Sequence, residues 1–118
     1  MLQTKEWIDG LTKMVMEGKI LEAFEQYYAD DVVMQENEDA PRVGKDANRE
    51  YEKAFVEGVV EVHDMKVLGI AVGEDYSTTE MFMDVTHKDW GRIARSQVST
   101  THWKDGKVVR EKFYYNTK

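Results

Sequence analysis

The spacing of apolar residues predicts three helices in the first half of the chain. In the first segment apolar side chains recur every three or four positions, as on a helix that packs by one face, at Trp7, Ile8, Leu11, Met14 and Val15. We expect Thr4 to cap this helix and Gly18 to end it. The same spacing predicts a second helix over Lys19–Ala29 and a third over Lys45–Phe55.

Helical spacing changes to strand spacing within the segment Phe24–Gly44, and the rest of the chain is arranged around this corner. Two acids, Asp30 and Asp31, are expected to end the second helix because negative charge at a helix C-terminus opposes the macrodipole. A short strand, Val32–Glu36, should follow. Its alternation places Glu36 on the same side as the apolar residues of the strand.

From position 59 onward, apolar and polar residues alternate, and turn signals interrupt the alternation three times. This pattern predicts a meander of four long strands, at Val59–Val72, Tyr76–His87, Arg92–Lys104 and Lys107–Asn116. The polar residues 37–44, which hold the only proline, are predicted to be a loop. Because long antiparallel strands coil and bend, the sheet should be concave on one face. Three amphipathic helices on that face give an α+β half-barrel with a mixed sheet and a pocket between the layers.

Length, charge and cysteine content narrow the class of protein. A chain of 118 residues can bury about two-thirds of its unfolded surface as one domain, so we expect a single domain over residues 1–118. The net charge of −7 disfavours nucleic acid and anionic membranes as partners. The absence of cysteine excludes disulfides, thiolate zinc sites and cysteine nucleophiles. Without a signal-peptide core or a membrane-spanning apolar stretch, the sequence predicts a cytoplasmic protein.

Three short motifs, in a fixed order, carry a resemblance to a known family. They are an aromatic-Ala-Asp-Asp-Val corner at Tyr28–Val32, a glycine at the start of the third helix (Gly44), and an Asp-Gly-Lys-hydrophobic hairpin at Asp105–Val108. They lie within YYADDVVMQEN, PRVGKDANREYEKAF and HWKDGKVVREKFYYN. This arrangement resembles the SnoaL-like branch of the nuclear transport factor 2-like (NTF2-like) superfamily over nearly the whole chain.

The resemblance implies a cone-shaped half-barrel, with three N-terminal helices packed on a strongly curved sheet, and a deep pocket. It does not imply one activity, because that superfamily includes isomerases, cyclases, dehydratases, epoxide hydrolases and non-catalytic binding modules. It also implies frequent dimers. We expect a homodimer here because the convex sheet face, with Val108, Tyr114 and Val98, is left uncovered by the helices.

Glu36 is the first candidate for a general base. A glutamate at the end of an apolar row lies either at the rim of the core or in an apolar cavity, where lost solvation makes a carboxylate more basic. Resemblance to the ketosteroid isomerases implies the cavity, because their general-base aspartate aligns with Glu36. Their oxyanion-stabilising tyrosine and buried aspartate align with Thr12 and Ser99, so the pair of donors that steroid isomerisation needs is missing. The alternative is that Glu36 begins a solvated acidic loop.

Glu111 is the second candidate. Alternation along the last strand places Val109, Glu111, Phe113 and Tyr115 on one face, and the opposite face carries Val108. The first face is the more apolar and should point inward. A carboxylate beside aromatic rings could transfer a proton or bind a polar ligand group. It could equally make a structural hydrogen bond to a tyrosine hydroxyl or a histidine.

A further set of apolar and aromatic residues is expected to line the pocket and bind the substrate. These residues are Met14, Tyr28, Met34, Tyr51, Phe55, Met81, Met83, His102, Trp103, Phe113 and Tyr115. Methionine adapts to irregular volumes, so the many methionines favour a real cavity over a completely filled core. Whether His102 faces inward depends on the register of its hairpin.

No cofactor or metal site is expected. The three histidines, His63, His87 and His102, lie far apart, and there is no phosphate-binding glycine loop or nucleotide fingerprint. The sequence therefore predicts acid–base chemistry of the isomerase, cyclase or hydrolase type on a hydrophobic small molecule, with Glu36 or Glu111 as the proton carrier. The alternative is a module that binds a small molecule, or dimerises, without catalysis.

Overall fold

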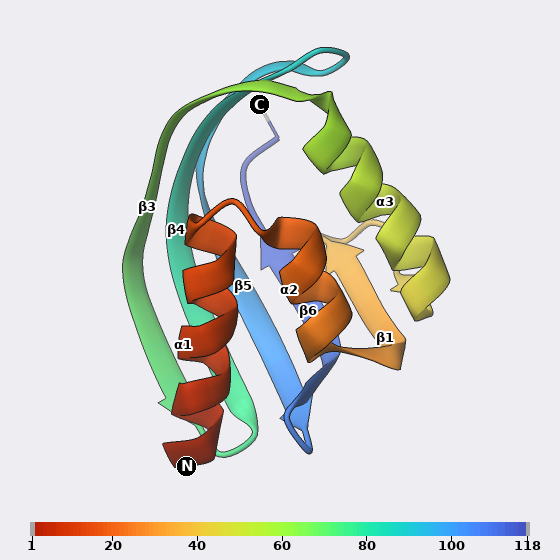
Figure 1. Cartoon of the computed structure of the whole chain (residues 1–118), viewed down its shortest axis with the longest axis vertical. Helices are drawn as coiled ribbons and strands as arrows, with labels where there is room; N and C mark the ends of the chain where they lie inside the picture. The colour runs from red at the N-terminus through yellow and green to blue at the C-terminus, as the bar shows by residue number, and fades with distance from the viewer. Residues whose placement is uncertain (1, 118) are drawn as a thin grey trace.

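Residues 2–117, which the computed structural model of the chain describes, form three helices and six strands (Figure 1). The helices are α1 (Leu2–Met16), α2 (Ile20–Tyr27) and α3 (Lys45–Gly58). The strands are β1 (Tyr28–Glu36), β2 (Arg42–Val43), β3 (Val59–Gly73), β4 (Tyr76–His87), β5 (Gly91–Lys104) and β6 (Lys107–Tyr114). None of the helices described is long and apolar enough to cross a membrane.

The strands form one mixed sheet in the order β2-β1-β6-β5-β4-β3. β1 pairs with β6 in parallel, and every other neighbouring pair is antiparallel. The sheet bends around the helices, with α1 and α2 in front of its middle and α3 beside β1 (Figure 1). The predicted α+β half-barrel, with helices on the concave face of a curved mixed sheet, is confirmed.

Most predicted element boundaries lie within a few residues of the observed ones, and the exceptions have physical causes. Thr4 does not cap α1, because it lies inside the first turn of that helix. Its hydroxyl accepts a hydrogen bond from the backbone N–H of Asp75 at 3.3 Å, which ties α1 to the β3–β4 turn. The predicted loop over residues 37–44 contains the two-residue strand β2, which pairs with β1. Two residues are too few to show a strand periodicity.

A closely packed core fills one end of the half-barrel, near the β3–β4 and β5–β6 turns. Its buried apolar residues are Ile8, Leu11, Ala23, Phe24, Tyr28, Val32, Met34, Trp103 and Val108. Trp103 packs against Trp7 with ring centroids 5.8 Å apart, and its Nε1–H donates to Ser77 Oγ at 2.9 Å. The indole is therefore fully satisfied inside the core.

A β-bulge corrects the predicted facing of Val108. The prediction placed Val108 on the convex face, but the side chain is fully buried in the core. His102 pairs with Arg110 whereas Trp103 pairs with Val108, so Val109 is an extra residue on β6. The extra residue resets the alternation, and Val108 and Glu111 both face the helices.

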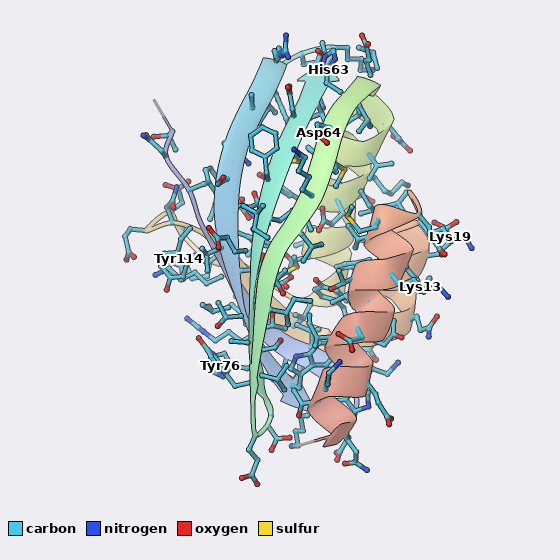
Figure 2. The ribbon with its side chains drawn as sticks, turned by 90° about the vertical axis from the view of Figure 1, so that its left-hand side faces the viewer. Lys13, Lys19, His63, Asp64, Tyr76 and Tyr114 are labelled. Carbon is cyan, nitrogen blue, oxygen red and sulfur yellow. The ribbon has the colours of Figure 1, made fainter. Side chains whose placement is uncertain are left out.

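Tyr114 does lie on the convex face, 43% exposed, and Figure 2 shows it with Tyr76 on the side of the sheet away from α1. Dimerisation through this face stays a prediction.

His87 fastens the C-terminal end of α3 to the β4–β5 turn. Its Nδ1 accepts hydrogen bonds from the backbone N–H groups of Asp89 and Trp90, at 3.1 and 3.3 Å. Nε2 therefore carries the proton and donates to the carbonyl of Ala54 on α3, at 3.0 Å. The imidazole also stacks on the Trp90 indole, with centroids 3.9 Å apart and planes 7° from parallel. The ring lies directly against Gly58, where a Cβ would meet Nε2 at 1.9 Å.

Gly58→Ala should therefore destabilise the fold by displacing His87 from the carbonyl of Ala54. We expect a loss of about 1–3 kcal/mol in the free energy of unfolding, as for overpacking at a site that cannot relax freely. Urea denaturation followed by circular dichroism measures it. Gly69→Ala is the matched control, because a Cβ there meets nothing within 4 Å, and its stability should be unchanged or slightly raised. Equal stability of both variants would contradict the close packing of His87.

Candidate functional site

A cavity of about 830 Å³ lies between the helices and the sheet, beyond the packed core. Most of its wall is apolar, with Phe55, Met65, Met81, Met83, Val85 and Ile93 among the lining residues. Three large apolar lining residues are well exposed, namely Met16 (41%), Val62 (57%) and Trp90 (48%), so the cavity opens to solvent near the end of α1 and the β4–β5 turn. Figure 1 shows β3, β4 and β5 rising beyond α1 at this end. The volume lies within the range of small-molecule sites.

Glu111 is held on the cavity wall by two hydroxyl donors. The Tyr28 hydroxyl donates a short hydrogen bond to Oε1, and Thr101 Oγ1 donates to Oε2 at 3.0 Å. Only 4% of Glu111 is exposed. Burial raises the pKa of Glu111 to about 7, against the lowering effect of the two hydrogen bonds, and the charge of Glu36 raises it further. Burial, followed by the charge of Glu111, also raises the pKa of Tyr28.

Glu36 lies on the same wall, as the strand alternation predicts, but it is neither a solvated loop acid nor alone in an apolar pocket. Its Oε2 accepts a hydrogen bond from Arg42 Nη2 at 3.0 Å, and its Oε1 accepts one from the Tyr115 hydroxyl at 2.8 Å. The Glu36 side chain is only 12% exposed. Burial, and then the hydrogen bond to Glu36, raises the pKa of Tyr115. Glu36 is thus an ion-paired carboxylate.

Arg42 enters the site from β2, and sequence reasoning did not single it out. Its Nε donates to Asn48 Oδ1 at 3.1 Å, and its guanidinium lies 3.7 Å from the centroid of the Tyr51 ring. Asn48 is fully buried and donates to the carbonyls of Arg42 and Gly44, at 3.0 and 2.8 Å. This network fixes the loop after β1 against α3 and sets the direction of the Arg42 side chain.

Glu52, on α3, is the main functional candidate that sequence reasoning missed. It lines the cavity and is half-buried, and it makes no hydrogen bond to any residue within 2–117. The pKa of Glu52 is raised to about 7. Burial is the largest cause, the negative charges of Glu111 and Glu36 add to the rise, and the positive charge of Arg42 opposes it. A signal was present, because Glu52 follows Asn48 by four positions and precedes Phe55 by three. That spacing places it on the inner face of the helix.

The remaining predicted lining residues divide between the cavity, the core and the outer face. Those on the cavity wall are Tyr28, Tyr51, Phe55, Met81, Met83, Phe113 and Tyr115. Met34 and Trp103 do not line the cavity, because their side chains are buried in the core. Met14 does not line it either, and it packs against the same core. His102 lies on the opposite face of the sheet, where its ring meets the Tyr76 ring edge-on, with the two ring centroids 5.0 Å apart. No three His, Asp or Glu side chains within residues 2–117 gather in a way that could hold a metal ion.

Comparison with known proteins identifies the family. The family model for the SnoaL-like domain matches residues 2–115. The chain belongs to the SnoaL-like domain family. No curated protein matched it in a sequence search.

Several solved structures share the architecture of this SnoaL-like protein. One structure, from Mesorhizobium loti, is named as a proposed SnoaL-like polyketide cyclase and, in brackets, as a carbohydrate phosphatase. It is 31% identical in sequence to this chain and superposes with a TM-score of 0.83. The match covers 94% of this chain and 97% of that one. A proposed SnoaL-like polyketide cyclase from Jannaschia sp. CCS1 is 10% identical (TM-score 0.81; 98% and 86% covered). A proposed isomerase from Bacillus subtilis is 17% identical (TM-score 0.76; 97% and 86% covered). The last two show a shared fold.

The raised pKa of Glu111 has a consequence for the stability of this SnoaL-like protein. The folded carboxyl binds its proton with a pKa of about 7 and the unfolded one with a pKa of about 4.5, so the folded state holds more protons between these values. Stability should therefore fall as the pH rises from about 4.5 to 7. One pKa unit is about 1.4 kcal/mol, so Glu111 contributes up to about 3 kcal/mol to this fall.

Glu111→Gln should flatten that dependence. The amide can still accept from Tyr28 and can donate to Thr101, so the variant should match the wild type near pH 5 and exceed it at pH 8. Urea denaturation at several pH values measures the difference. The exposed Glu74→Gln is the control and should follow the wild-type curve. Parallel curves for Glu111→Gln and the wild type would show that Glu111 is not buried with a raised pKa.

Proposed function

We propose that this protein catalyses proton transfer on a small, predominantly apolar molecule bound in the cavity, with Glu52 as the group that exchanges the proton. One observation carries the proposal: Glu52 lines the cavity, has a pKa raised to about 7, and has no hydrogen-bond partner within residues 2–117. A general base works best when its pKa lies near the operating pH and its oxygens are free to reach the substrate.

The other two carboxylates are less suited to exchange a proton with a substrate. Both Glu36 oxygens accept hydrogen bonds, from Arg42 and Tyr115, and both Glu111 oxygens accept from Tyr28 and Thr101. Their contribution is electrostatic. The negative charges of Glu111 and Glu36 raise the pKa of Glu52, which makes its carboxylate a stronger base once it is ionised.

The proposed step conserves atoms and charge within the bound molecule. The ionised Glu52 carboxylate accepts a proton from a carbon next to a carbonyl group, and the electron pair moves onto the carbonyl oxygen. Glu52 then returns the proton to the same carbon or to another atom of the bound molecule. The apolar wall around Met81 and Met83 excludes water from the reacting carbon. Two similar structures are named as a proposed polyketide cyclase and a proposed isomerase, and reactions of both kinds can begin with removal of a proton from carbon.

Hydrogen exchange tests the proposal without knowledge of the natural substrate. A panel of small ketones, aldehydes and esters is incubated with the protein in D₂O, and loss of the C–H signal is followed by NMR. We expect faster exchange than in buffer for at least one compound, with a rate that rises with pH around 7 because only ionised Glu52 accepts a proton. Glu52→Gln should lower that rate by about 10² or more.

Glu50→Gln is the matched control, because Glu50 is exposed on the same helix. It should exchange the compound at the wild-type rate. Full activity of Glu52→Gln, or no compound exchanging above the buffer rate, would contradict the proposal.

The alternative is a protein that binds a small molecule without catalysis, and the largely apolar lining favours it. A methionine-rich wall, with Met65, Met81 and Met83, adapts to ligands of different shape. A compound that binds in the cavity but shows no exchange in the same experiment would support this second function.

A further inference from the structure

Arg95 brings an unpaired positive charge to the cavity wall. It comes from β5, where it pairs with Met83 of β4, and it lines the cavity. Its Nε atom is fully buried and has no hydrogen-bond partner within residues 2–117. No carboxylate of those residues lies within 4.0 Å of its guanidinium nitrogens. A buried N–H group without an acceptor is unfavourable, because its lost hydration is not replaced.

Its neighbour in the cavity shows what a satisfied arginine looks like in this protein. Arg42 binds Glu36 and Asn48, and it lies over the Tyr51 ring. Arg95 shares only the last of these features, since its guanidinium lies 3.7 Å from the centroid of the Tyr115 ring. No other Lys or Arg within residues 2–117 lines the cavity. Arg95 is thus the one cation there whose charge the protein itself leaves unbalanced.

The carboxylate of Glu36 is held by contacts to residues other than Arg95. Tyr115 offers its ring face to Arg95 and its hydroxyl to Glu36, and the second Glu36 oxygen belongs to Arg42. Stacking on Tyr115 uses the face of the guanidinium, so a partner that enters through the cavity would meet the in-plane N–H groups of the two terminal nitrogens rather than the buried Nε–H.

We propose that Arg95 binds the carboxylate of a small organic acid whose apolar body fills the cavity. The planar fork of N–H donors matches a carboxylate. A single negative charge balances the one free cation, whereas a phosphate dianion would meet the carboxylates of Glu36, Glu52 and Glu111 on the same wall. The inference rests on the proposed function in taking this cavity as the substrate site, and it names the substrate class.

Binding of matched probes tests the inference. The probes are phenylacetate, decanoate and 1-naphthaleneacetate, each with its neutral amide, and phenyl phosphate. Isothermal titration calorimetry measures the dissociation constants. For the wild type we expect at least one acid to bind ten-fold or more tightly than its amide, and phenyl phosphate to bind more weakly than phenylacetate. Arg95→Met should bind acid and amide alike, and Arg95→Lys, which keeps the charge but not the fork, should retain part of the preference.

Two controls separate a binding role from a structural one and from the proposed function. Arg95→Met without probe should melt at the wild-type temperature or higher, because no internal hydrogen bond or ion pair is lost and the methionine can still pack on the Tyr115 ring, whereas Arg42→Met should melt lower. Glu52→Gln should keep the preference for acids even though its proton exchange is lost, so the two proposals can fail independently. The inference is overturned if no acid binds, if amides bind as well as acids, if phenyl phosphate binds best, or if Arg95→Met keeps the preference.

Discussion

The difference in length between a strand and a helix of the same number of residues determines this structure. α1 and β3 each contain 15 residues. A helix of that size spans about 22 Å, at about 1.5 Å per residue, and a strand spans about 50 Å, at about 3.3 Å per residue. The longest dimension of the molecule is 38 Å, so β3 and its neighbours must bend. A helix packed on such a sheet covers only part of it, and the uncovered part of the concave face becomes the cavity.

The polar wall of the cavity is built where the parallel pair of β1 and β6 meets α3. Three carboxylates, Glu36, Glu52 and Glu111, face the same space as two arginines. Burying so many ionisable groups lowers stability, and apolar residues of similar size would pack there more favourably. The arrangement is the kind found where a protein sacrifices stability for chemistry, because it shifts the pKa of two carboxyls towards neutrality.

Sequence patterns predicted the fold well and the site in part, for definable reasons. Alternation over a dozen residues fixes long strands such as β4, whose bounds match the prediction. The rule that alternate residues of a strand face opposite sides fails at the β-bulge of β6, where the extra residue Val109 reverses the side that Val108 faces. Glu52 was missed because a charged residue in an amphipathic helix normally faces solvent. Arg95 could not be recognised, because an unsatisfied cation is defined by the absence of neighbours, and only the folded structure shows which neighbours are absent.

The placement of the three tryptophans gives the cavity an optical reporter of its own. Trp7 and Trp103 pack together in the core, at the far end of the half-barrel. Trp90 lies at the mouth, stacked on His87 and half-exposed to solvent. A molecule that binds against Trp90 changes the surroundings of that indole, while Trp7 and Trp103 keep theirs. The intrinsic tryptophan fluorescence of the unlabelled protein therefore reports a molecule bound at the mouth of the cavity.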